Sequence, residues 1–294
     1  MKILKLLLIL ILFPTVAFCG SSSRIISLAP AITEILYALD AGESIAGVTD
    51  YCDYPPDAKE KPSIGGFINP NIEKIIALNP DLVILSPNSG TKTIKEKLDR
   101  FNLKNQVVSF YTLNDLREAF LILGEIVDRK NNAESMVKEL DGIVEEIQVL
   151  MNKKGKGRPD VLFVRSHSPL YVAGRGTYED DIIDAAGGMN CVKWSNGRYP
   201  NYNIEEIIRL NPEIIIDATY YDTPSKEEAD ELLEFWGKYK GINAVKSGKV
   251  YIIKTDIHSV PGPRTAECIK ILAQIIHPEL FGVDVDDGQF LKML

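Results

Sequence analysis

The sequence predicts an α/β protein of two lobes, each with a mostly parallel sheet, joined by a single long rigid helix, with a ligand cleft between the lobes. Strand and helix patterns alternate over residues 24–110 and again from residue 159, as is typical of parallel sheets. Residues 71–85, NIEKIIALNPDLVIL, return at 203–217 as NIEEIIRLNPEIIID, with nine of fifteen positions identical. One long amphipathic helical pattern lies between the copies. An interface between lobes is the usual place for a small-molecule site.

Residues 1–19 are predicted to be a secretory signal peptide. Two lysines precede an apolar run from Leu6 to Phe13, and small residues follow. This run is too short for the about 20 residues that cross a bilayer. We favour cleavage near Cys19 and export to the periplasm as a soluble protein, because Phe18 is bulkier than the residue that usually precedes a lipidated cysteine. Acylation of Cys19 is the alternative.

The first lobe is expected over residues 24–128. Short β-branched or apolar runs predict strands, and apolar residues at 3-4 spacing predict helices. Gly42 ends the first helix, and Asn79–Pro80 ends the helix of the first repeat copy. The elements in order are strand RIISL, helix AITEILYALDAG, strand SIAGVTDY, helix NIEKIIAL, strand DLVIL, helix TIKEKLDRFNL, strand QVVSF and a helix over 113–128.

The connecting helix is expected over residues 129–154. Apolar side chains recur at 3-4 spacing from Ala133 to Met151, with charged residues between them, and KKGKGRP ends the pattern. A flexible linker would be rich in Gly, Ser or Pro, which this segment is not. We therefore expect a stiff spacer and little lobe motion on ligand binding.

The second lobe is expected over residues 158–294. Its alternation repeats that of the first lobe and places the two copies of the repeat at equivalent points. The elements in order are strand DVLFVRS, helix YEDDIIDAAGG, helix NIEEIIRL, strand EIIID, helix KEEADELLEFWGKYKG, strand KVYIIK and helix RTAECIKILAQIIH.

Composition excludes several classes of function. The net charge of −8 argues against general nucleic-acid binding. The sequence lacks GxSxG, HExxH, a P-loop and a CxxC or Cys/His cluster, so we expect no enzyme and no metal site. Export permits disulfides. Cys52, Cys191 and Cys268 allow three pairings, and the presence of Cys191 and Cys268 in the same half favours that pair.

Aromatic residues gather in the segments that follow the predicted strands, where the core does not need them. Such segments face the crevice of parallel sheets. Aromatic walls with a few polar anchors suit a large, flat and partly apolar ligand. The side chains singled out in these segments are Tyr51, Phe67, His167, Tyr171, Trp194, Tyr199, His258 and Arg264.

The chain resembles the periplasmic binding proteins of the helical-backbone class, which serve ABC importers of cobalamin, haem and iron–siderophores. RIISLAPAITEILYALDAGESIAGVTDYCDYPP, GGFINPNIEKIIALNPDLVIL and PGPRTAECIKILAQIIHPE carry the resemblance over nearly all of residues 24–282. Within the class, DYPP and the GPR before the last helix are most like the cobalamin-binding members. The resemblance implies a monomer that binds a corrinoid, needs no cofactor of its own and delivers the ligand to a permease.

The resemblance also implies roles for single residues. Tyr51, Phe67, Tyr171, Tyr199 and Arg264 stand where the family places ligand contacts. Ser86 departs from an aromatic position, so haem or an iron–siderophore is the alternative ligand. His167 and His258 could then bind a ligand metal axially, although a hydrogen-bonding role is the commoner one for such histidines. An anionic siderophore would require Arg165, Arg175, Arg198 and Arg264 to point inward.

Glu73 and Glu205 open the helices of the two repeat copies. A Glu in the first turn is favoured by the helix dipole, which explains each residue but not their equivalence. The resemblance implies that each lobe offers this carboxylate to basic residues of a two-fold symmetric permease dimer.

Overall fold

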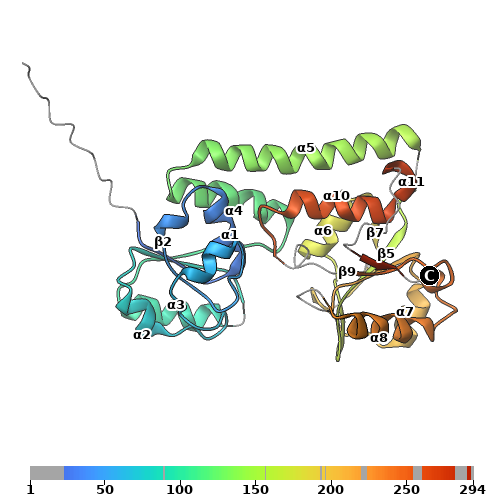
Figure 1. Cartoon of the computed structure of the whole chain (residues 1–294), viewed down its shortest axis with the longest axis horizontal. Coiled ribbons are helices and arrows are strands. Elements are labelled where there is room, and N and C mark those ends of the chain that lie inside the picture. Colours follow the sequence, from blue (N-terminus) through green and yellow to red (C-terminus); the bar gives the residue numbers. More distant parts are fainter. Residues whose placement is uncertain are drawn as a thin grey trace, which may run out of the picture.

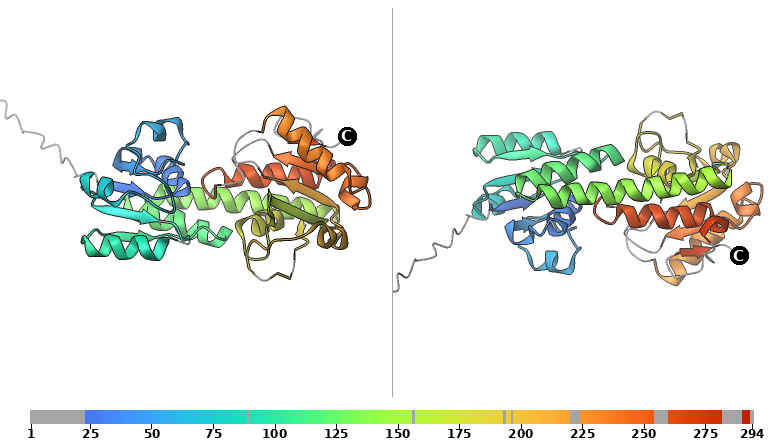
Figure 2. Two further views of the ribbon diagram at one scale, coloured as in Figure 1. Left: turned by 90° about the horizontal axis from the view of Figure 1, so that it is seen from below. Right: turned by 90° about the horizontal axis from the view of Figure 1, so that it is seen from above.

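The computed structural model describes residues 23–88, 90–155, 157–192, 194–195, 197–219, 224–253, 260–281 and 290–292. Two lobes, each around its own sheet, lie along one side of helix α5 (Lys130–Lys154) (Figures 1 and 2). The predicted α/β class with two lobes is therefore confirmed. The expected signal segment 1–19, Cys19 and His258 lie outside the described residues. Within the described part of the chain, no helix is both long and apolar enough to cross a bilayer.

The first lobe surrounds a fully parallel sheet. Its strands are β1 (Ile25–Ser27), β2 (Ile45–Val48), β3 (Leu82–Leu85) and β4 (Asn105–Val107), in the order β2-β1-β3-β4. Its helices are α1 (Pro30–Ala38), α2 (Ile72–Ala77), α3 (Thr91–Arg100) and α4 (Leu113–Ile126), with the short 3-10 helices η1 (Gly42–Ser44) and η2 (Pro56–Glu60). Because the strands are parallel, the segments that follow them all start from one edge of the sheet.

The second lobe surrounds a mixed sheet in the order β10-β9-β8-β5-β6, with β7 beside β5. The strands are β5 (Asp160–His167), β6 (Leu170–Val172), β7 (Met189–Asn190), β8 (Ile214–Asp217), β9 (Val250–Ile253) and β10 (Phe290–Lys292). The helices are α6 (Tyr178–Ala185), α7 (Ile204–Leu210), α8 (Lys226–Gly237), α9 (Asn243–Lys246), α10 (Thr265–Ile276) and α11 (Pro278–Phe281). Among the strands of the described residues, β6 and β10 alone run antiparallel to their neighbours.

Strand β6 is absent from the sequence prediction, which assigns this stretch to a loop. Its three residues are too few to show an alternating pattern. The strand forms because β5 turns back on itself, with Ser166 opposite Tyr171 and His167 opposite Leu170.

The repeated segment folds in the same way in both lobes. Helices α2 and α7 each begin at an asparagine, Asn71 or Asn203, whose side chain accepts the backbone N–H three residues later. Each copy then turns at the asparagine of its Asn-Pro pair, with φ of 45° at Asn79 and 50° at Asn211, a conformation that asparagine tolerates better than most residues. The chain then enters β3 or β8.

Helix α5 joins the lobes through packing as well as through the chain. Its buried side chains Ala133, Leu140, Ile147 and Met151 lie on one face, and the helix packs on α4 of the first lobe and α10 of the second. One continuous hydrophobic cluster contains these residues together with core residues of both sheets. Helix α5 is thus part of a core that the two lobes share.

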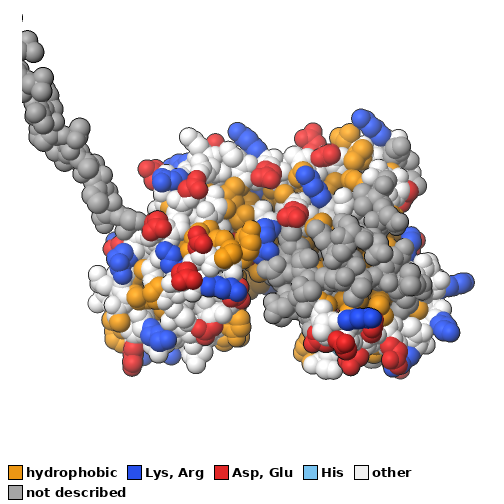
Figure 3. Space-filling model, in the orientation of Figure 1, with side chains coloured by type: hydrophobic (Ala, Val, Ile, Leu, Met, Phe, Trp, Pro, Cys, Tyr) orange, Lys and Arg blue, Asp and Glu red, His pale blue; other side chains and the backbone are white. Residues whose placement is uncertain are grey.

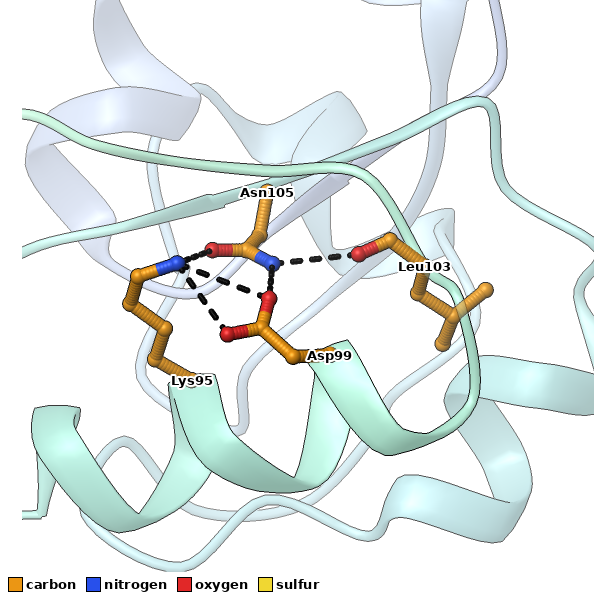
Figure 4. A network of polar contacts seen from close by, with 4 residues as sticks. All are labelled: Lys95, Asp99, Leu103 and Asn105. Carbon is orange, nitrogen blue, oxygen red and sulfur yellow. Dashed lines mark hydrogen bonds and ion pairs between the residues drawn. The ribbon is translucent and has the colours of Figure 1, made fainter.

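A polar network holds the turn from α3 into β4 (Figure 4). The side-chain amide of Asn105 donates to Asp99 Oδ1 at 2.8 Å and to the carbonyl of Leu103 at 3.0 Å, while Lys95 Nζ donates to Asn105 Oδ1 at 3.1 Å. The hydrogen bond from Asn105 lowers the pKa of the exposed Asp99 carboxyl. The network fixes the start of the strand that leads to the cleft.

The predicted disulfide between Cys191 and Cys268 is wrong, because no disulfide joins these residues. Cys191 packs in the cluster on one face of the second sheet, with Leu162, whereas Cys268 belongs to α10 on the opposite face, with Phe163. The sheet therefore lies between the two sulfurs, while a disulfide requires Cα atoms within about 7 Å. Burial raises the pKa of the Cys268 thiol to about 12, so this thiol is protonated and unreactive.

The separation of the two cysteines predicts additive effects on stability. Cys191→Ala and Cys268→Ala should each lower the free energy of unfolding by roughly 1 kcal/mol, and the double variant by the sum, because distant sites act independently. Urea unfolding of the four proteins measures this, with dithiothreitol expected to leave the wild-type midpoint unchanged. A double variant no less stable than either single variant would indicate a disulfide instead.

Candidate functional site

A cavity of about 850 Å³ lies at the carboxyl edge of the first sheet. It faces the second lobe, and the space-filling view shows the indentation between the lobes (Figure 3). Five aromatic side chains and two carboxylates line it, and the segment before α10 adds a small part of the wall. These residues are Tyr51, Tyr54, Phe67, Phe110, Tyr111, Glu34 and Asp53, with Val260 and Pro261 from the second lobe.

Tyr51 and Phe67, which the sequence predicts as ligand contacts, both line this cavity. Tyr51 follows β2, and its side chain is 62% exposed at the rim. Phe67 is partly buried and packs against the core that the lobes share. The first lobe therefore brings together the two predicted contacts that it contains, one exposed to solvent and one packed against the core.

Tyr171, Trp194 and Tyr199 belong to one unit of the second lobe and are not in the lining of this cavity. An isolated antiparallel bridge joins Tyr171 on β6 to Asn201, which holds the segment that carries the other two rings beside the strand. Tyr199 donates its hydroxyl to Glu179 Oε2 at 2.9 Å, and Trp194 is 84% exposed. The second lobe thus presents aromatic surface from a strand and the loop next to it.

Arg264 joins the lobes through Glu34 of α1. Its Nε–H donates to Glu34 Oε2 at 3.0 Å and its Nη2–H to Oε1 at 2.6 Å. The guanidinium carbon also lies 4.2 Å from the centre of the Tyr54 ring. The side chains are 15% and 2% exposed for Arg264 and Glu34, so the ion pair is largely removed from water. The structure therefore shows Arg264 engaged by the protein itself.

Two further arginines near the cleft are also engaged. Arg165 lies 3.4 Å from the buried Glu179, and the guanidinium of Arg198 lies 3.8 Å from the centre of the Tyr111 ring. Arg175 is exposed. Of the four arginines that an anionic ligand would use, three already contact acidic or aromatic side chains.

His167 belongs to a buried polar group. Its Nε2 lies 2.6 Å from Asp217 Oδ2, and Trp236 Nε1–H donates to the same oxygen at 2.8 Å. The register shift between Val164 and Ser166 turns His167 toward the face of the sheet on which Asp217 lies. His167 therefore has a hydrogen-bonding role in the structure. Its Nε2 is engaged by Asp217 and is not available to a ligand metal.

The predicted axial role of His258 falls on a residue outside the described part of the chain. Among the described residues, no group of three or more His, Cys, Asp or Glu side chains could hold a metal ion.

The carboxylates at the heads of the repeat are exposed on both lobes. Glu73 and Glu205 each lie in the first turn of their helix, and neither has an ion-pair partner among the described residues. One turn later, each helix exposes an isoleucine at the equivalent position, 38% for Ile76 and 44% for Ile208. Residues three apart share a helix face, so each lobe presents a carboxylate beside an apolar side chain.

The family model described as "Periplasmic binding protein" matches residues 25–257. The chain belongs to this family. It is 29% identical over 269 residues to an uncharacterized ABC transporter substrate-binding lipoprotein, YvrC, of Bacillus subtilis, covering 88% of this chain and 81% of the relative. It is 26% identical over 275 residues to a vitamin B12-binding protein of Vibrio cholerae, covering 92% and 96%.

Solved structures share the fold of this periplasmic binding protein. The vitamin B12-binding protein BtuF of Vibrio cholerae matches with a TM-score of 0.74 at 23% identity, covering 87% of this chain and 97% of that one. A periplasmic heme-binding protein of Pseudomonas aeruginosa matches with a TM-score of 0.78 at 21% identity, covering 92% and 98%. Proteins named for different ligands therefore have this architecture.

Sequence reasoning missed several cavity residues of this periplasmic binding protein. Phe110 and Tyr111 follow β4, so the rule that places such segments at the crevice would have found them. Tyr111 donates its hydroxyl to the carbonyl of Pro87 at 3.2 Å, beside Ser86, where the family pattern leads one to expect an aromatic residue. No local sequence pattern marks Glu34 as a cavity residue, because its ion-pair partner Arg264 is 230 residues away in the chain.

Another contact between the lobes joins α6 to the start of α4. Asp181 Oδ2 accepts the backbone N–H of Leu113 at 2.7 Å. Burial raises the pKa of the Asp181 carboxyl, and the charges of Asp180 and Asp184 raise it further. The ionised carboxylate is therefore less favourable in the folded protein than in the unfolded chain.

The raised pKa of Asp181 gives a signed prediction for stability against pH. Asp181→Asn keeps an oxygen acceptor without the charge, so at pH 7 it should be at least as stable as the wild type. The stability advantage of Asp181→Asn over the wild type should vanish as the pH falls through the pKa of Asp181 in the folded protein and below its value of about 3.9 in the unfolded chain. Asp181→Ala loses the acceptor and should cost about 1 kcal/mol at either pH. Urea unfolding at pH 7 and pH 3.5 measures these differences, and an Asn variant that is less stable only at pH 7 would contradict the sign.

Proposed function

We propose that this protein is the ligand-binding component of an ABC importer and that it carries cobalamin or a related corrinoid. The observation that carries the proposal is the cavity of about 850 Å³ with five aromatic side chains, at the sheet edge that faces the second lobe. Such a cavity suits a large, flat and partly apolar molecule. The names of two relatives, a vitamin B12-binding protein and an ABC transporter substrate-binding lipoprotein, support the same function.

The charges around the cavity favour a corrinoid over the alternatives, haem and iron–siderophores. Haem carries two propionates, and siderophores are usually anionic, whereas the corrin ring carries neutral amides at its edge. Three of the four arginines that would bind anions contact Glu34, Glu179 or the Tyr111 ring. A ligand with a neutral edge can bind without disturbing these contacts.

In this proposal the ligand lies between aromatic surfaces of the two lobes. Tyr51 and Phe67 form the first wall, and Tyr171 and Tyr199 form the second, with Trp194 at the mouth. Arg264 completes the set predicted from the sequence, although any contact that it makes with the ligand must compete with Glu34. The protein performs no reaction, in keeping with relatives that are named as binding proteins.

The permease dimer is the proposed macromolecular partner. Glu73 with Ile76, and Glu205 with Ile208, form two equivalent exposed patches, one on each lobe. Two copies of one patch match a two-fold symmetric receptor, in which basic residues would meet the carboxylates. The protein acts as a monomer outside the cytoplasmic membrane, either soluble or, like the lipoprotein relative, anchored through a lipid at Cys19.

The ligand proposal predicts the effects of changes in the cavity wall. The purified protein should bind cyanocobalamin more tightly than haem or a ferric siderophore. Tyr51→Ala and Phe67→Ala should each weaken cyanocobalamin binding roughly 10-fold to 100-fold, because each removes aromatic contact area. Phe101→Ala changes an exposed ring outside the cavity and should leave affinity unchanged. Isothermal titration with the three ligands measures these values, and tight haem binding without cyanocobalamin binding would refute the corrinoid proposal.

The docking proposal predicts a loss of uptake without a loss of ligand affinity. Glu73→Lys and Glu205→Lys should each reduce permease-dependent uptake, and the double variant should abolish it, because like charges repel at the receptor surface. Glu227→Lys is the matched control, since Glu227 is also exposed in the first turn of a helix. Uptake assays in cells at physiological salt measure this, and normal uptake by the double variant would contradict the docking role.

A further inference from the structure

The wall of the cavity is electrically balanced. Among the described residues that line it, the charged side chains are Glu34 and Asp53. Glu34 is paired with Arg264, and Asp53 lies 3.6 Å from Lys59 at the surface. Each carboxylate therefore has its own cation, and neither cation is itself in the described lining.

Arg264 is held in a way that occupies its best donors. Two of its N–H groups bind both oxygens of Glu34 in the fork geometry that guanidinium and carboxylate prefer. Tyr54 covers its flat face at 4.2 Å. A carboxylate on a ligand could take this edge of the guanidinium only by displacing Glu34, which would then be a buried charge without compensation and therefore costly.

We propose that the Glu34–Arg264 ion pair sets the charge preference of the cavity: it neutralises the guanidinium beside the cavity, so that a ligand with a neutral amide edge is preferred to the same ligand with carboxylates. The inference rests on the proposed function, because it takes this cavity as the ligand site. In this inference Glu34 determines specificity for the charge of the ligand. The aromatic residues alone would not distinguish a neutral ligand from an anionic one.

The second lobe has a matching arrangement. Glu179 is buried, lies 3.4 Å from Arg165 and accepts the hydroxyl of Tyr199 at 2.9 Å. Like Glu34 with Arg264 and Tyr54, it combines a buried glutamate with an arginine and a tyrosine. In each lobe one arginine is therefore paired with a buried glutamate of the protein, and an anionic ligand that approached it would meet a similar obstacle on each side.

Ligand pairs that differ mainly in the charge at the edge of the ring test the inference. One pair is cyanocobalamin and a monocarboxylic acid made from it by hydrolysis of one peripheral amide, and the other is haem dimethyl ester and haem. The wild type should bind the neutral member of each pair about ten-fold or more tightly than the anionic member. Equal affinities within both pairs would overturn the proposal without the need for any variant.

Variants at the ion pair give the second part of the test. Glu34→Gln frees the guanidinium, so affinity for the anionic members should rise about ten-fold relative to affinity for the neutral members. The double variant Glu34→Gln with Arg264→Gln has no freed cation and should lose this gain. Circular dichroism melting confirms that each variant is folded. A pair that only holds the lobes together would change stability while leaving the ratio of anionic to neutral affinities unchanged, and that result would refute the proposal.

The outcome for this inference can be separated from that for the proposed function. Discrimination between haem and its ester by a protein that does not bind cyanocobalamin would refute the corrinoid ligand and support the role of Glu34. Tight binding of cyanocobalamin and of its carboxylic acid alike would support the corrinoid ligand and refute the role of Glu34.

Discussion

The hydrophobic cluster that both lobes share under α5 is the constraint on which the rest of the structure depends. Leu140 and Ile147 of α5 pack in the same cluster as Ile25 of the first sheet and Phe163 of the second. Moving the lobes apart would expose part of this cluster to water, at a cost that grows with the apolar area exposed. We therefore expect a largely preformed cleft, in which ligand recognition depends on what the walls present rather than on a large closure.

Polar contacts complete the link between the lobes on the cleft side. Arg264 binds Glu34, Arg198 stacks on Tyr111, and Asp181 accepts the N–H of Leu113. Together with the core under α5, they restrain the lobes from two sides. The same contacts use up charged groups next to the cavity, so the features that remain for a ligand are mainly aromatic faces. In the function that we propose, stability of the interface and selectivity of the site thus have a common physical origin.

The sequence was most informative where structure depends on local pattern. Helix α5, the strand and helix alternation and the repeat with its two Asn-Pro turns follow from periodicity and capping within a few residues. What the sequence did not reveal concerns pairs far apart in the chain. The Cys191–Cys268 disulfide failed because sequence does not reveal which face of a sheet each residue joins. The engagement of Arg264 was missed because its partner is 230 residues away, and no local signal connects them.

The shared core also bears on how a permease could recognise this protein. Because α2 and α7 belong to lobes that one core holds together, we expect Glu73 and Glu205 to keep a nearly constant spacing whether or not a ligand is present. In the docking that we propose, this spacing identifies the protein to the receptor but carries little information about occupancy. The signal that the site is filled must then come from the cleft, where the ligand covers aromatic side chains such as Tyr51 and Trp194 that are otherwise exposed. In this proposal, docking and ligand sensing therefore involve different surfaces of the protein.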